Sequence, residues 1–225
     1  MRRPFLFEVI APLAASLAGT VAAAPGVAAQ AYNYPAFQPP VLAEREYNFA
    51  AASAGHAGTS LLAQWREGVS PRFQFSFDGG LAAPEGRGAD TRVLLGGAFA
   101  WQVARADSAF PFDAALTAGV GFSTGNSNSV VRVPVGVALG HRFTLEGGYT
   151  LTPFVHPRLS LDRCSACRAG GSDGKVNVDV DVGAAFAVND QLTLRVAALL
   201  GGADFLGATN AVGLAVAWTP RGLRK

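Results

Sequence analysis

Charged side chains recur at every second position in several stretches of this 225-residue chain. Lys175, Asn177, Asp179 and Asp181, for example, would share one face of an extended strand. Buried charges persist only when they are paired and hydrogen-bonded, and the planar fork of arginine suits carboxylates. We therefore predict an Arg–carboxylate network inside an enclosed lumen. Its members are Arg66, Arg72, Arg92, Asp113, Arg132, Arg142, His156, Arg158, Asp162, Lys175, Asp179, Asp181 and Arg195, with Glu46 and Asp78 on the same parity.

Two roles are open for such a network. It can be a static filling of paired charges, or it can line a narrow water-filled passage that filters solutes by charge. Asp179 and Asp181 could also bind a cation, but alternating carboxylates on one strand are a weak signal. We predict no metal site and no cofactor.

Residue combinations that could be catalytic are sparse. His56, Ser60 and Asp78 would lie near one rim of a barrel, but no nucleophile motif surrounds them. His156 is expected to be a hydrogen-bonded lumen residue, and His141 is expected to point outward near a membrane interface. The chain is therefore predicted not to be an enzyme.

Cys164 and Cys167 form a Cys-Ser-Ala-Cys pair. In an exported chain, a disulfide within a loop is the favoured interpretation. A metal site would need two further ligands, and no residues nearby supply them at a useful spacing. A redox site of the thioredoxin type would need a helix after the first cysteine, which the Gly-rich stretch that follows does not offer.

The elements that must position these residues are β-strands. In the segment 91–105, Val93, Leu95 and Trp101 fall on one face, whereas Arg92 and Ala98 fall on the other. Period-two alternation predicts strands with two different environments. The fold class is then all-β: a single closed, antiparallel, up-and-down transmembrane barrel of ten strands, with eight as the alternative. The expected strands are 45–53, 59–67, 71–79, 91–105, 111–123, 129–143, 148–162, 175–188, 191–201 and 208–219.

The connections are expected to alternate in length. Short turns at one end of a barrel and longer loops at the other are typical of outer-membrane barrels, whose short turns face the periplasm. Pro134, Pro153 and Pro157 lie within expected strands and predict bulges or local breaks, because proline lacks a ladder donor. The expected short turns are 67–70, 106–110, 144–147 and 189–190, and the expected loops are 53–58, 79–90, 124–128, 163–174 and 202–207.

Alternation alone does not decide which face is outside, because a soluble barrel for a lipophilic ligand alternates with its apolar face inward. The non-apolar face is rich in Gly and Ala, which suit the crowded inside of a narrow barrel. Aromatic residues on the other face cluster at the level of the short turns, as in a membrane-interface girdle. Phe77 and Phe122 would form a thinner upper ring. The girdle consists of Tyr47, Trp65, Phe73, Trp101, Phe112, Phe143, Tyr149, Phe186 and Trp218.

The N-terminus predicts export. Arg2 and Arg3 precede an Ala-rich apolar run, and residues 27–29 form a small-residue cleavage motif, so residues 1–29 are expected to be a signal peptide, with a membrane anchor as the alternative. Residues 30–43 are predicted to be a Pro-rich periplasmic linker, which could also block the lumen. Residues 44–219 would form the barrel and 220–225 a short basic tail.

Composition supports a membrane location. Charged residues make up 15% of the chain, the formal net charge is +2, and lysine occurs only at positions 175 and 225. A soluble β-protein would cover its surface with more charge. Because no basic stripe or recognition motif is present, no nucleic-acid partner is expected.

The pattern resembles that of the small bacterial outer-membrane β-barrel family, whose members have about eight to ten strands. The resemblance covers residues 44–219 and rests on runs such as 133–143 and 149–154. It departs from the family at its end, because residues 219–225 follow Trp218, where many members end on an aromatic residue.

The resemblance implies the outer membrane of a diderm bacterium, with the lipid bilayer and the export and barrel-assembly machinery as partners. It also implies a structural or surface-contact role through extracellular loops, for an unidentified ligand. A small passive channel or transporter is the alternative, and a soluble periplasmic barrel for a lipophilic ligand is a further one. The oligomeric state is left open.

Overall fold

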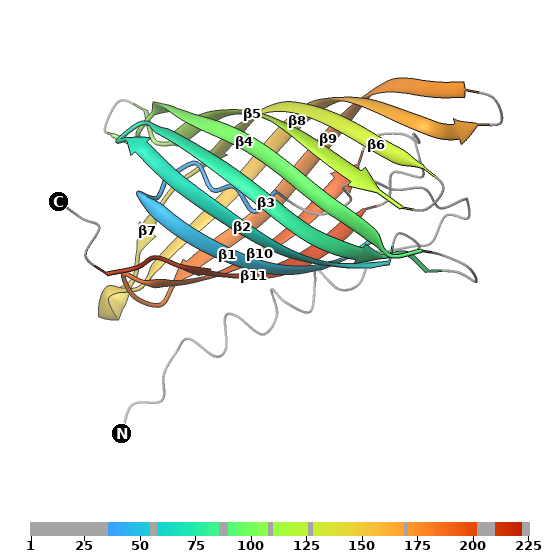
Figure 1. The fold of residues 1–225 in the computed structure, drawn as a ribbon. Helices are drawn as coiled ribbons and strands as arrows, with labels where there is room; N and C mark the ends of the chain where they lie inside the picture. The colour runs from blue at the N-terminus through green and yellow to red at the C-terminus, as the bar shows by residue number, and fades with distance from the viewer. Residues whose placement is uncertain are drawn as a thin grey trace.

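The computed structural model shows a closed antiparallel β-barrel (Figure 1). It describes residues 36–54, 58–85, 90–107, 110–125, 128–168, 171–201 and 210–221, with 166–168 and 171–173 given by their backbone alone. The strands are β1 (Arg45–Ser53), β2 (Thr59–Ser70), β3 (Phe73–Ala83), β4 (Arg92–Ala104), β5 (Asp113–Thr124), β6 (Ser129–Gly140), β7 (Phe143–Thr144), β8 (Thr150–Arg168), β9 (Gly171–Ala187), β10 (Leu192–Gly201) and β11 (Ala211–Trp218), with a 3-10 turn, η2 (Glu146–Gly148), after β7.

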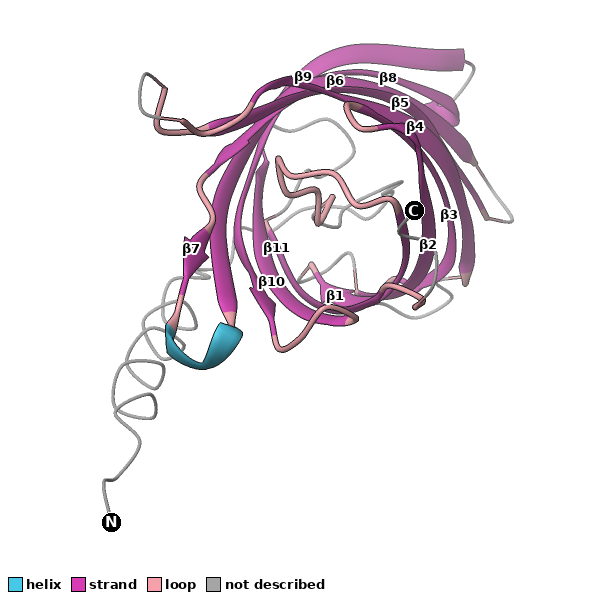
Figure 2. Ribbon diagram, turned by 90° about the vertical axis from the view of Figure 1, so that its left-hand side faces the viewer, coloured by secondary structure: helices cyan, strands magenta, loops and turns pink. Residues whose placement is uncertain are grey.

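Ten long strands form the wall, as predicted. Each pairs with its neighbours in the chain, β1 pairs with β11, and β6 pairs with β8, which closes the sheet into a ring (Figure 2). The two-residue β7 pairs only with the start of β8 and is not one of the strands that form the barrel wall. In the part of the chain that the structure describes, no helix has the length and hydropathy to cross a membrane.

The orientation of the two faces is confirmed. Trp101, Val135 and Leu194 are 52%, 47% and 44% exposed, although they are large and apolar. The alternate residues, including Arg132, Asp179 and Asp181, are buried. A water-soluble barrel would show the reverse, so this outer surface suits hydrocarbon.

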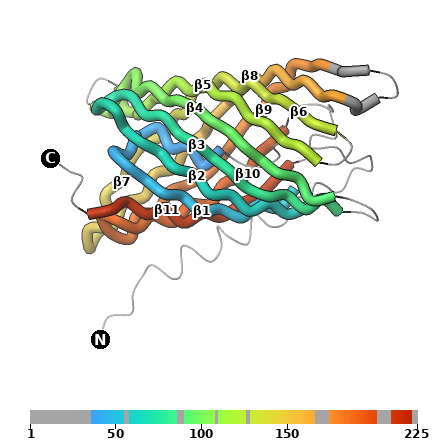
Figure 3. Tube along the Cα trace, viewed as in Figure 1, coloured from blue at the N-terminus to red at the C-terminus, as the bar shows by residue number. Residues whose placement is uncertain are grey.

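The prediction of short turns at one end and long loops at the other is only partly correct. Residues 71–72 and 188–191 are short, but residues 105–112 and 141–149 are longer connections at that same end. At the opposite end, β8 and β9 continue as a paired hairpin through most of 163–174 (Figure 3). The alternation of outward apolar residues continues into this region with Leu161 and Val176, which is typical of extended strands.

The prolines interrupt pairing without moving the register. The β6–β8 pairing passes over the two positions opposite His156 and Pro157, and the β5–β6 pairing passes over those opposite Val133 and Pro134. On both sides of each gap the partners follow one register, and β8 pairs with β9 through Pro153 and Pro157 unchanged. Local breaks are therefore present, and bulges at these positions are not.

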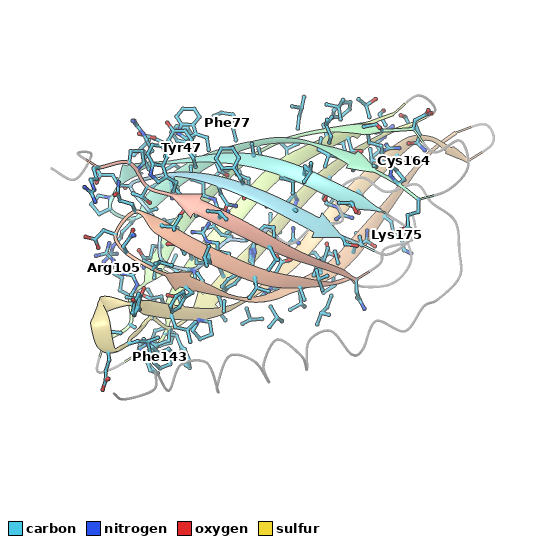
Figure 4. The ribbon with its side chains drawn as sticks, turned by 90° about the horizontal axis from the view of Figure 1, so that it is seen from below. Tyr47, Phe77, Arg105, Phe143, Cys164 and Lys175 are labelled. Atoms are coloured by element: carbon cyan, nitrogen blue, oxygen red, sulfur yellow. The ribbon has the colours of Figure 1, made fainter. Side chains whose placement is uncertain are left out.

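Aromatic side chains gather at the end of the barrel that holds the start of β1 and the end of β11. Tyr47 lies opposite both Trp65 and Trp218 in the sheet, and its ring is 5.7 Å from that of Trp218. Figure 4 shows Tyr47, Phe77 and Phe143 near this end, far from Cys164 and Lys175. Phe77 therefore belongs to the same band, because it pairs with Trp65, and the expectation that it forms an upper ring is wrong.

Candidate functional site

The buried charges of the lumen form two clusters, the first around Glu46 of β1. Arg195 of β10 donates from Nη1 and Nη2 to the two Glu46 carboxylate oxygens, at 2.6 Å each. Arg66 of β2 donates from Nη1 to Glu46 Oε1 at 3.1 Å. Alternation places all three side chains on the inner face, where each is at least 95% buried. One carboxylate thus holds two arginines from either side of the β1–β11 seam.

The second cluster lies on β6, β8 and β9. Arg132 donates from Nε and Nη2 to the two oxygens of Asp162, at 2.7 Å each. Asn177 donates to Asp162 at 2.6 Å, and Arg132 Nη1 lies 3.7 Å from Asp179 Oδ2. The register explains this meeting, because Arg132 is directly opposite Asp162 and Asn177 is two residues along β9 from the partner of Asp162.

Asp181 extends the second cluster along β8 and β9, because its partner Arg158 lies directly opposite Asp179 of that cluster in the sheet. Arg158 Nη2 donates to Asp181 Oδ1 at 2.9 Å, and His156 Nδ1 lies 3.2 Å from Asp181 Oδ2. The other ring nitrogen of His156, Nε2, is 2.8 Å from Thr117 Oγ1 on β5. The order Asp181–His156–Thr117 has the form of a hydroxyl nucleophile with its base and orienting acid.

The surroundings of Thr117 favour a structural role for this chain of contacts. Asp181 is shared with Arg158, so its charge is already balanced. The adjoining cavity of about 90 Å³ is lined by Thr117 and His156 together with Arg158, whose guanidinium occupies Asp181.

The N-terminal segment 36–43 lies inside the barrel, where a loop crosses the ring of strands (Figure 2). Arg66 Nη2 donates to the carbonyls of Ala36 and Phe37, at 3.1 and 3.0 Å, and Gln74 Nε2 donates to the carbonyl of Ala43 at 2.8 Å. Residues 36–43 therefore lie in the lumen, the position that a linker blocking the passage would take. Three hydrogen bonds, donated by two side chains of the wall to carbonyls of the segment, hold it in the lumen.

Phe37 anchors the segment. It is fully buried, in a left-handed backbone conformation with φ 49°, which is strained for an aromatic residue. Its ring fills the space that a side chain at Gly213 would need, because a Cβ there would lie 2.6 Å from Phe37 Cζ. Around it lies an apolar cluster within the otherwise polar lumen, formed with Ala50, Ala52, Leu62, Ala82, Leu94, Phe154, Ala197 and Ala215.

Two cavities lie on either side of this segment. The smaller, of about 90 Å³, is lined by Ala36 and Gln38 together with Thr117, Arg66 and Arg158. The larger, of about 550 Å³, is at the aromatic end and is lined by residues 39 and 41–43 of the segment with the ends of β8 to β11. The segment therefore separates the smaller cavity, called the inner cavity below, from the larger one at the aromatic end, called the mouth cavity.

Three predicted network residues lie outside both clusters. Arg72 is exposed in the turn between β2 and β3, and Arg142 is exposed beyond the end of β6, where it lines the mouth cavity. Lys175 is exposed because β10 reaches only Asp179, which leaves the start of β9 above the closed wall. Parity gives the face of a residue but not its depth, so these three residues at the strand ends are exposed and are not part of the two buried clusters.

Two further predicted residues sit at the rims. Arg92 is buried at one end, where it donates to Ser123 Oγ at 2.9 Å and to Asn128 Oδ1 at 2.6 Å. Asp113 is buried at the other end and accepts from the backbone N–H of Ala106 at 3.1 Å. Neither contact is an Arg–carboxylate pair, so these two residues hold the ends of strands β4 to β6 and their connections.

The rim residues weighed as a catalytic combination, His56, Ser60 and Asp78, are not shown to meet in one site. His56 lies outside the described residues, and Ser60 is opposite Ala82, four residues along β3 from Asp78. Four strand residues span roughly 13 Å. Among the residues that the structure describes, no group of three His, Cys, Asp or Glu side chains could hold a metal ion.

Cys164 is buried near the far end of β8, and no described cysteine is free. The side chain of Cys167 lies outside the described residues, so its pairing with Cys164 stays a prediction. The signal peptide 1–29 and residues 222–225 of the basic tail lie outside them as well.

No family model matches the chain, and no curated protein matches it. Among solved structures, a designed transmembrane β-barrel is 12% identical, covering 80% of this chain and 96% of the design, with a TM-score of 0.36. The KdgM porin is 7% identical, covering 78% and 99%, with a TM-score of 0.39. The siderophore receptor PirA from Pseudomonas aeruginosa is 11% identical, covering 79% and 42%, with a TM-score of 0.25. The closed strand order and the apolar outer face show independently that the chain has the architecture of an outer-membrane β-barrel.

Proposed function

We propose that this chain is an outer-membrane barrel that is closed at rest and displays the β8–β9 hairpin at the cell surface. The observation that carries the closed state is the filled lumen. Segment 36–43 and two clusters of paired charges occupy the interior, while the outer face is apolar. A permanently open channel would instead keep a continuous solvated path.

The hairpin supports a surface role. Its two strands pair as far as Arg168 and Gly171, whereas β10 ends opposite Asp179 and β6 begins opposite Ser165. The hairpin thus rises past both neighbours, at the end of the barrel opposite the aromatic band (Figure 1). If the aromatic band marks the periplasmic interface, this end faces the medium. A Cys164–Cys167 disulfide would brace the hairpin near its tip.

Lysine labelling tests both orientation and surface display. The chain has only two lysines, and Lys175 is exposed on the hairpin, whereas Lys225 follows the strand end on the aromatic side. An amine reagent that cannot cross membranes should modify Lys175 and spare Lys225 in intact cells, and should modify both after the outer membrane is permeabilised.

Lys175→Arg is the matched control, since it keeps the charge and removes the reactive amine. Labelling of Lys225 alone in intact cells would reverse the orientation. Extraction of the folded protein without detergent would contradict the membrane location.

A further inference from the structure

The segment 36–43 is placed to act as a plug. Ala36 and Gln38 line the inner cavity, and residues 39 and 41–43 line the mouth cavity. Both cavities lie within one lumen, so the segment is the material between them. Removing it would join about 90 Å³ and about 550 Å³ of open space with the volume that the segment itself fills.

The attachments of the segment are local and reversible. They are a few hydrogen bonds from Arg66 and Gln74, the buried ring of Phe37, and Pro40, which packs near Gly140 of β6. None of them belongs to the strand pairing that closes the barrel. The Glu46–Arg195 pair does not involve the segment, so the wall can stay intact when the segment leaves.

The inner cavity presents mainly positive groups. Arg66, Arg132 and Arg158 line the inner cavity, with Asp78 as the one carboxylate among its lining residues. The carboxylates that pair with Arg132 and Arg158, namely Asp162, Asp179 and Asp181, do not line it. Fixed arginines at a constriction favour anions over cations.

We propose that residues 36–43 are a removable plug, and that their withdrawal opens a passage that prefers small anions. The proposal rests on the membrane location in the proposed function and adds a conducting state to it. It concerns the interior, so it can fail while the labelling of Lys175 still supports the surface role.

Conductance of the full-length protein in planar bilayers with potassium chloride tests the plug. Phe37→Ala removes the anchoring ring, and the open fraction should rise by about tenfold or more, the order of change that burial of one Phe side chain controls. Phe49→Ala is the matched control, because Phe49 is 60% exposed on the outer face of β1. It should conduct like the wild type.

Gly213→Ala gives a second route to the same state. The added Cβ would lie 2.6 Å from Phe37 Cζ and would push the ring out without altering the segment itself. If both folded variants conduct no more than the wild type, the plug proposal is wrong. A wild type that already conducts as much as Phe37→Ala would overturn it as well.

A cross-link distinguishes withdrawal of the segment from general loosening of the barrel. A Cβ at position 140 would lie 3.1 Å from Pro40 Cγ, so the two positions are neighbours, but it would also overlap the Pro153 carbonyl oxygen, and the heat-dependent gel shift must therefore first show that the reduced double-cysteine variant folds. In Phe37→Ala, the added pair Pro40→Cys and Gly140→Cys should return conductance to the wild-type level when oxidised and release it when reduced. High conductance with the cross-link formed would overturn the plug.

The sign of the reversal potential in a potassium chloride gradient tests the solute class. The Phe37→Ala barrel should favour chloride over potassium. Arg158→Gln in that background should reduce this preference, since it removes a lining charge and leaves Asp181 less well balanced. A preference for potassium in Phe37→Ala would overturn the anion assignment.

Discussion

The inner faces of β8, β9 and β10 carry Arg, Asp and His side chains, whereas the inner faces of β4, β5 and β6 are mostly Gly and Ala around their centres. The outer faces of both regions are alike, since Leu159 and Val178 on the charged wall are about as exposed as Val120 and Val135 on the small-residue wall. Contact with lipid requires apolar side chains on the outer face of every strand. The inner face has no such uniform requirement, because side chains from different strands need only fill the lumen together.

The two walls are complementary in size. His156 of β8 reaches Thr117 of β5 across β6, and a Cβ at Gly136 of β6 would lie 3.0 Å from His156 Nε2 and 2.8 Å from Arg158 Cγ. The long side chains of the charged wall therefore lie over the small residues of the other wall. Where no long side chain lies over them, the inner cavity remains.

Loss of the β1 carboxylate that pairs with Arg195 of the charged wall should have the largest effect. Glu46→Gln leaves Arg66 and Arg195 buried without their shared anion, and we expect a loss of about 3 kcal/mol in the free energy of unfolding. Denaturant titration in detergent micelles, followed by the heat-dependent gel shift, measures it.

Glu67→Gln is the control for geometry. Arg45 donates to both Glu67 oxygens at 2.6 Å, as Arg195 does to Glu46, but this pair is partly exposed. Its loss should cost about 1 kcal/mol or less. Equal losses in the two variants would show that burial does not set the stabilisation that such an Arg–Glu pair provides.

Enlarging a residue of the small-residue wall should have an intermediate effect. In Gly136→Ala the new Cβ would lie 2.6 Å from the Pro157 carbonyl oxygen, which is backbone and cannot swing away. We expect a loss of about 1–3 kcal/mol, as in other overpacked interiors. Gly97→Ala adds the same atom on the outer face, 3.6 Å from the Phe77 ring, and should change stability by less than about 0.5 kcal/mol. Similar losses of stability in the two variants would mean that glycine is needed for the strand backbone at both positions, and not for space in the lumen.

The contrast between the walls also explains what could be predicted from the sequence. Strand positions followed from alternation, and residues 45–53 and 192–201 were predicted nearly to the residue. Alternation was strong because lipid and lumen select opposite residue types at neighbouring positions. The continuous apolar stripe then fixed which face was outside.

The partners within the lumen could not be predicted in the same way. Glu46 and Arg195 are 149 residues apart, and they meet only because the barrel closes between β1 and β11. The segment 36–43 has no period, so nothing in its pattern shows that Phe37 is buried. Arg142 has the right parity but lies beyond a strand end, where parity no longer indicates burial.

The smallest effect should come from the contact that joins the two walls. Thr117→Val keeps the size of the side chain and removes the hydroxyl that lies 2.8 Å from His156 Nε2. We expect a loss of about 1 kcal/mol, since one neutral hydrogen bond is removed and His156 keeps its contact with Asp181. Thr117→Ser retains the hydroxyl and should lie closer to the wild type in the same denaturant titration. A loss as large as that of Glu46→Gln would mean that the two walls form a single cooperative network, since a hydroxyl outside the charge clusters would then be needed to hold them.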